Sequence, residues 1–312
     1  MNYTFPVELI FQAVQDELPK AQTVGFLQGF ENGLQNKIDF VDHDGAWTQV
    51  ASISPRGQVT LSVTYCQFLL LLCHIGLIVH DSIAVASELE KLTDVELDQY
   101  RRELTIDCPL TRFLRDIPDF DTAVKYSSHL IDLARPLLTS KPITQAEFDA
   151  LVNEVDYDSP LVTRANSLCV YGIVFILLHE ASHAILKQDL SSDGNEQEEN
   201  DADHNAFWAM WGDLKGEQRN TAMMGCICAL ASLLFFNPSM VSDGIHPRED
   251  ERLFAFYDIL NEEKTSYTEM LVILLAAWAA VFSINGFPAL EDSYEETLTK
   301  QRAFLANIGK ES

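Results

Sequence analysis

Residues 177–185 of the chain read LLHEASHAI, and they end a long stretch of sequence that can form one unbroken helix. The stretch begins at Ser159 and Pro160, a capping residue followed by proline at the first helical position. From there to about Lys187 only Gly172 weakens the helix, and most of the side chains are apolar. We therefore expect a buried core helix with the HEASH segment, residues 179–183, near its end.

The HEASH segment has the spacing of a metal-binding helix. His179 and His183 are four residues apart, so on a helix they share one face with β-carbons about 5–6 Å apart. Two such imidazoles can bind one Zn²⁺ ion at about 2.0–2.1 Å each. Glu180 is rotated by about 100° from His179 and would flank the ion. There it could accept a proton from the attacking water and later pass it to a leaving amine. The alternative is a helix with two core histidines.

The third ligand is expected just downstream, because catalytic zinc sites usually have three protein ligands. Between Asp189 and Asp203 the chain has seven carboxylates and no lysine or arginine, and a divalent cation would relieve their repulsion. Glu199 and Asp203 are four residues apart on a helix expected over 196–211, so both can face the HEASH helix. We predict that Glu199 is a metal ligand and that Asp203 accepts a hydrogen bond from the far nitrogen of a ligating histidine.

Other residues of this segment leave alternatives open. Glu196 and Glu198 are the reserve candidates for the third ligand. His204 could bind the metal in principle, but it points away from the helix face that carries the predicted ligand. The whole segment could instead be a solvated acidic loop.

A third element is His246, which precedes Pro247 in an expected loop, with Arg252 six residues after the histidine. A histidine in this place could donate a hydrogen bond to the oxyanion that forms when a carbonyl is attacked. Arg252 would support the substrate or the structure. Alone, a loop histidine before proline is more often a surface residue.

The first half of the chain is mixed in character. Residues 46–53 and 58–65 alternate apolar with polar or small side chains around the turn composition Ser54-Pro55-Arg56-Gly57, which predicts a β-hairpin. The hairpin should lead into an apolar helix over 66–89. We expect further helices over 122–138, 144–155, 221–236, 247–261 and 267–284, followed by a polar tail.

The predicted fold class is mostly α, as an α+β protein with a helical zincin-like core and a small β-hairpin in the N-terminal half. A boundary near residue 140 would separate a mixed part, 1–140, from a helical metal-binding part, 141–312. One continuous domain is the alternative.

The amino-acid composition indicates which kinds of partner and which cellular compartment to expect. The 47 acidic against 21 basic residues, for a net charge of −26, repel phosphate backbones, so we expect no nucleic-acid partner. The six cysteines lack CxxC spacing and mostly lie in apolar runs, as in a reducing compartment, and no secretory signal is expected. We therefore expect a cytoplasmic protein. The apolar runs fall short of the roughly 18–20 uninterrupted residues that span a membrane, so membrane association is the less favoured alternative.

The three elements together resemble the gluzincin pattern HExxH, ExxADxxA and HPxxxxR. The chain has HEASH at 179–183, ENDADHNA at 199–206 and HPREDER at 246–252. The HtpX-like and prenyl-protein membrane peptidases carry that order. By this resemblance Glu199 is the third zinc ligand, Asp203 supports a ligand, and His246 is a transition-state donor.

The short spacing between the elements is more similar to two other groups. Glu199 lies only 16 residues after His183, and clear membrane spans are missing. One group is the ImmA-like and IrrE-like peptidases, which cut repressors. The other is the family of the phage exclusion protein Lit, a bacterial HExxH peptidase of similar length that cleaves elongation factor Tu. We favour the Lit family because of chain length, the mid-chain HExxH and the lack of a DNA-binding segment.

The resemblance implies a zinc-dependent endopeptidase that acts on an intracellular protein. The hairpin at 46–65 could offer an edge strand on which an extended substrate pairs. Two alternatives remain: a non-catalytic, zinc-stabilised protein-binding module, and a membrane-associated peptidase. The sequence does not predict the oligomeric state.

Overall fold

The structure is a computed structural model. It describes residues 13–14, 16–17, 38–41, 50–53, 59–89, 93, 130–132, 135–139, 160–189, 196–212, 214–236, 247–260, 265–291 and 293–308. The predicted helix over 144–155 and the predicted boundary near residue 140 lie outside these ranges. The division into two parts therefore stays a prediction.

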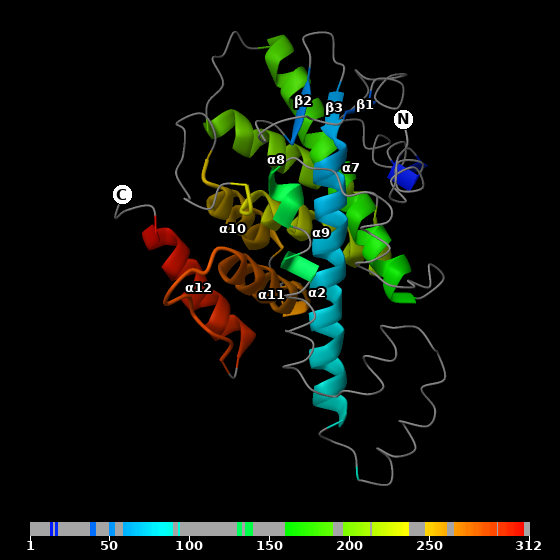
Figure 1. The fold of residues 1–312 in the computed structure, drawn as a ribbon. Helices are drawn as coiled ribbons and strands as arrows, with labels where there is room; N and C mark the ends of the chain where they lie inside the picture. Colours follow the sequence, from blue (N-terminus) through cyan, green and yellow to red (C-terminus); the bar gives the residue numbers. More distant parts are fainter. Residues whose placement is uncertain are drawn as a thin grey trace.

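Helices dominate the fold, and one small sheet lies in the N-terminal half (Figure 1). The central helix α7, Pro160–Asp189, packs against α2, Val63–Leu89, against α8, Glu196–Trp211, and against α9, Gly216–Leu233. Helices α10, Glu249–Ile259, α11, Thr265–Val281, and α12, Tyr294–Ile308, complete the described part of the chain. The predicted mostly helical α+β class is confirmed.

The sheet contains the predicted hairpin and one more strand. Strand β2, Ala51–Ile53, pairs antiparallel with β3, Val59–Ser62, and β3 leads directly into α2. Strand β1, Ile38–Val41, pairs parallel with β3, so the strand order is β1-β3-β2. Strand β1 was not predicted from the sequence. Strand β1 has four residues and pairs in parallel with a strand about twenty residues later. No tight turn connects the two, so no turn signal in the sequence predicts the pairing.

The helix that carries HEASH begins at Pro160, as predicted from the capping signal. Its middle crosses α9 at very short range, because Gly172 and Gly225 face each other's backbone. A β-carbon at Gly225 would lie 2.5 Å from the carbonyl oxygen of Leu168, and one at Gly172 would lie 2.9 Å from the carbonyl oxygen of Gly225. Gly172 is therefore a requirement of the crossing, whereas the sequence indicated only a tolerated glycine.

Two predictions near the ends of elements need correction. The residues after 284 were expected to form a polar tail, but residues 294–308 form α12, which buries Leu298 and Leu305. A signal was available, because the Ser293 hydroxyl accepts a hydrogen bond from the backbone N–H of Glu296, as at a helix start. In the predicted helix over 122–138, residues 135–139 form a 3₁₀ helix, η2, since Pro136 cannot donate a helical hydrogen bond.

The core is apolar and runs through all the long helices. The five described cysteines are free and buried, as expected of small apolar side chains. Segments Val63–Ile83 and Thr163–His183 are long and apolar enough to cross a membrane, but 94% and 83% of their apolar windows are buried inside the protein. Core helices have the same composition, so length and hydropathy alone assign no membrane span.

Candidate metal centre

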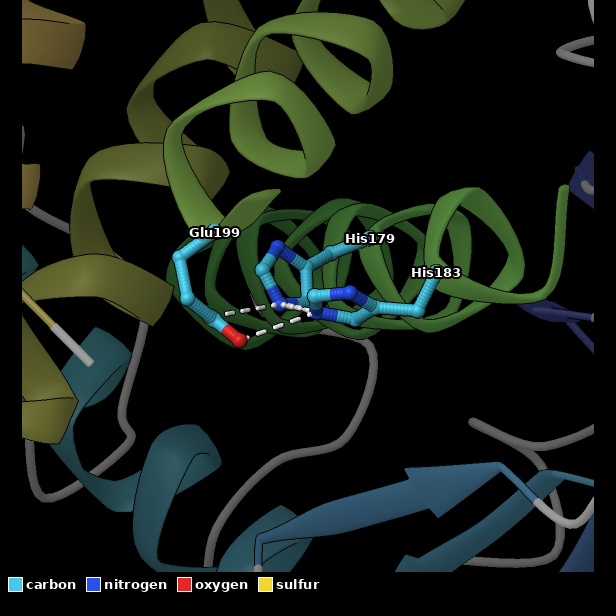
Figure 2. Close-up of side chains that lie close together, drawn as sticks. All are labelled: His179, His183 and Glu199. Carbon is cyan, nitrogen blue, oxygen red and sulfur yellow. Dashed lines mark hydrogen bonds and ion pairs between the residues drawn. The ribbon is translucent and has the colours of Figure 1, made fainter. Parts of the chain in front are cut away.

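Two histidines near the end of α7 turn the same ring nitrogen toward one point. His179 and His183 are 5% and 7% exposed, and their Nε2 atoms lie 3.0 Å apart (Figure 2). Their rings are nearly perpendicular, at 85°. The spacing of four residues along the helix brings the rings together, as the sequence predicted.

Glu199 reaches the same point from α8. Its carboxylate oxygens lie 3.4 Å from Nε2 of His179 and 3.2 Å from Nε2 of His183, and Figure 2 shows the three side chains converging. One ligand atom from each residue lies within 4.8 Å of the others, and all three residues are buried. Two imidazoles and a carboxylate are a donor set that zinc sites use. This group could hold a metal ion.

The far nitrogen of each histidine faces a second carboxylate from α8. Nδ1 of His179 lies 2.7 Å from Asp203, and Nδ1 of His183 lies 3.3 Å from Glu198. A carboxylate there keeps the ring proton on Nδ1 and leaves Nε2 free to bind a metal. Asp203 lies at the far nitrogen of a histidine, as the sequence predicted. Glu198, a reserve candidate for the third ligand, faces the opposite side of His183 from Glu199.

Arg252 of α10 contacts the group from the side of Asp203. Its guanidinium donates two hydrogen bonds of 2.8 Å to the Asp203 carboxylate and lies 3.7 Å from Glu199. The Arg252 residue is 9% exposed. Of the two roles considered for Arg252, this buried bidentate ion pair corresponds to structural support.

The buried charges do not balance within the group. Glu198, Glu199 and Asp203 carry three negative charges, and the guanidinium of Arg252 supplies one positive charge. With neutral imidazoles the group is left with two negative charges, which is the charge a divalent cation would neutralise. The residues present therefore fit a divalent metal ion in charge as well as in donor type.

The pKa values of these side chains reflect the same excess of negative charge. Burial lowers the pKa of His179, but Asp203 and Glu199 outweigh burial and raise that pKa to about 9. Burial raises the pKa of Glu199, but His179, His183 and Arg252 hold it well below its usual range. The pKa of Asp203 is held low in the same way, chiefly by Arg252 and His179 acting against burial. The group thus attracts positive charge strongly.

The remaining candidate residues lie outside the group formed by His179, His183 and Glu199. Glu180 follows His179 on α7 and is half-buried, whereas Glu196 at the start of α8 is exposed. His204 is exposed, and its Nε2 accepts a hydrogen bond of 2.6 Å from the indole of Trp208, so it does point away as predicted. His246 lies outside the described residues, and its role stays a prediction.

Sequence reasoning missed the contact between Glu198 and His183. A signal existed, because adjacent helical residues differ by about 100°, so Glu198 and Glu199 can reach different sides of one ring. The sequence could not predict how α8 packs against α7.

In a comparison with protein-family models, the model described as "Peptidase U49" matches residues 113–272. The match spans slightly more than half of the 312 residues and includes α7, α8 and Arg252. No curated protein and no solved structure matches the chain significantly.

Proposed function

The chain belongs to the peptidase U49 family, that of Lit, and is a peptidase; we propose that it is a zinc-dependent endopeptidase acting on an intracellular protein. The sequence resemblance to the Lit family is thereby confirmed. The proposal adds three points to membership of the family: zinc as the metal, an intracellular compartment, and cleavage within a polypeptide chain.

One observation carries the proposal: His179, His183 and Glu199 converge within the segment that the family model matches. Their nitrogen and oxygen donors suit Zn²⁺, and the two negative charges that the buried group carries when both imidazoles are neutral suit a divalent ion. A bound zinc ion would polarise the scissile carbonyl and lower the pKa of the attacking water.

The chain's own residues would handle the protons and the orientation. Glu180, next to His179 and half-buried, would accept the proton of the attacking water and deliver it to the leaving amine. Asp203, held by Arg252, would keep His179 in the tautomer that binds through Nε2. His246 would donate a hydrogen bond to the developing oxyanion.

The substrate would be an extended polypeptide. Strand β2 packs against α7, and within the described part of the chain its hydrogen-bonding partner is β3 on one side. The other edge of β2 would pair with the substrate backbone, since an edge strand presents N–H and C=O groups to an added strand. The five cysteines that the structure describes are free and buried, which agrees with a reducing, intracellular compartment.

The metal is tested by elemental analysis of the purified wild type and of Glu199→Ala. We expect about one zinc per chain in the wild type and a large loss in the variant. Glu196→Ala is the matched control, because Glu196 lies in the same helical turn but is exposed. A folded wild type that binds no zinc after reconstitution would end the zinc proposal.

The chemistry is tested with Glu180→Gln, which should keep its zinc and lose hydrolysis. Comparing cellular proteins after expression of the wild type and of Glu180→Gln would identify the substrate as a protein cleaved only by the former. If both produce the same phenotype, the chain works as a zinc-stabilised binding module instead.

A further inference from the structure

Glu198 lies in the first turn of α8, one residue before the proposed ligand Glu199. It is 8% exposed, and its Oε1 lies 3.3 Å from Nδ1 of His183. The second motif of the family resemblance, ExxADxxA, starts at Glu199 and does not contain Glu198. Its contact is nevertheless the counterpart, on His183, of the contact that Asp203 makes with His179.

The contact with Glu198 affects which ring nitrogen of His183 carries the proton. A neutral imidazole carries one N–H, and the nitrogen that binds a metal must be the one without it. Nε2 of His183 faces Glu199 and His179, so the proton belongs on Nδ1. A carboxylate at Nδ1 favours that tautomer and also fixes the orientation of the ring.

Glu198 also affects the charge of the buried group. Without it, the two remaining carboxylates and Arg252 would leave one negative charge in place of two. The attraction for a divalent ion would fall accordingly, because the site is buried and poorly screened. Orientation and charge thus act in the same direction.

We propose that Glu198 is a positioning residue for the metal site, which holds His183 in its metal-binding tautomer and completes the charge that a divalent cation neutralises. The inference rests on the proposed function, since it concerns the same metal. It predicts that α8 supplies one ligand and both carboxylate supports of the histidine pair.

A purely structural role is the competing explanation. Acidic residues in the first turn stabilise a helix through its dipole, and Glu196, Glu198 and Glu199 all lie there. Glu196 is exposed and is not one of the carboxylates that face His179 and His183, so Glu196→Gln removes a charge from the same turn and leaves those contacts in place. It is the control that separates the two roles.

The test is the zinc affinity of the full chain, measured by competition with a chromophoric chelator. We expect Glu198→Ala to weaken zinc binding by up to about 100-fold and Glu198→Gln by about 10-fold. The amide of Gln still accepts a hydrogen bond from Nδ1 but carries no charge. Glu196→Gln should stay within about twofold of the wild type.

A second readout uses Co²⁺ in place of zinc, whose visible spectrum reports the ligand geometry. Glu198→Ala should alter that spectrum, and Glu196→Gln should leave it unchanged. Thermal unfolding of the metal-free proteins shows whether each variant folds. If Glu198→Ala does not fold, the isosteric Glu198→Gln decides the question.

The outcomes separate the two proposals. Wild-type zinc binding with an unchanged affinity in Glu198→Gln and Glu198→Ala would overturn the role of Glu198 and leave the proposed function standing. Equal losses in Glu198→Gln and Glu196→Gln would assign the effect to the helix end and overturn it as well. A wild type that binds neither zinc nor Co²⁺ would remove both proposals.

Discussion

Helix α7 is held in two different ways along its length. In its middle it crosses α9 at Gly172 and Gly225, where backbone lies on backbone. Near its end it faces α8 across a buried group of two imidazoles and three carboxylates, with the guanidinium of Arg252 behind them. The first contact depends on shape and the second on charge.

The difference indicates which changes each region tolerates. At the crossing any added atom must displace backbone, so size decides, and charge is not involved. At the metal centre the side chains are polar and paired, so removing one charge leaves another buried without a partner. The predictions below run from the largest expected effect to the smallest, and those on Arg252, the metal and Gly225 test this contrast.

Arg252→Met should have the largest effect on stability. It leaves the buried Asp203 without its bidentate partner, and we expect the free energy of unfolding of the metal-free chain to fall by about 3–5 kcal/mol in urea denaturation. The matched control is Arg302→Met, because Arg302 makes a similar pair with Asp258, but with side chains 48% and 44% exposed. Removing that pair should cost about 1 kcal/mol or less. Equal losses at the two sites would contradict the view that burial decides.

A double variant sharpens the same point. Replacing both partners, as Asp203→Leu with Arg252→Met, should restore part of the stability lost in Arg252→Met, because the Asp203 carboxylate is then no longer buried without its bidentate partner. Zinc affinity should be lower in the double variant than in the wild type, since His179 has lost its carboxylate. A double variant as unstable as the single one would show that the pair acts through shape.

Metal removal should come second. Free zinc at about 100 to 1,000 times its dissociation constant stabilises the folded state by about 3–4 kcal/mol, and a chelator should abolish that gain. Hydrogen exchange should then accelerate in α8 and change little in α9, whose crossing with α7 contains no metal ligand. Equal acceleration in both helices would contradict a local effect at the charged end.

Gly225→Ala should lower the free energy of unfolding by about 1–3 kcal/mol, because its β-carbon would meet the Leu168 carbonyl oxygen at 2.5 Å. The matched control is Gly76→Ala, where the β-carbon would meet the sulfur of Met270 at 2.7 Å. That flexible side chain can move, so the control should cost less than about 1 kcal/mol. Urea denaturation measures both. Equal costs would mean that backbone contact does not decide.

His80→Gln should have the smallest effect, and one that depends on pH. The Asp81 hydrogen bond raises the pKa of His80 against burial, Glu269 adds to this, and Arg164 opposes it. A raised folded-state pKa stabilises the protein below about pH 6.5, and that contribution is lost as the pH rises through the folded pKa. The half-buried pair of His80 and Asp81 should contribute about 0.2–1 kcal/mol.

The measurement for His80 compares the wild type with His80→Gln in urea at pH 5.5 and pH 8.5. The difference between the two proteins should be larger at the lower pH. A difference that is constant, or larger at pH 8.5, would contradict the assigned sign.

Local signals in the sequence predicted much of the fold. The hairpin of β2 and β3, the start of α7 at Pro160 and the bounds of α8 all followed from capping, turn and periodicity patterns that extend over a few residues. Strand β1 was missed because its partner is distant in the chain. Helix α12 was missed although its capping residue was visible, because its polar composition outweighed a narrow apolar stripe.

The sequence by itself determined that His179 and His183 lie side by side, because a helical spacing of four residues brings two side chains together wherever the helix lies. Only the tertiary structure decided which carboxylate meets which nitrogen. Glu198 and Glu199 differ by about 100° around one helix, and the docking of α8 on α7 selects Glu199 for the Nε2 atoms and Glu198 for Nδ1. Spacing along a helix is set by local backbone geometry, whereas contacts between helices depend on packing across the whole core.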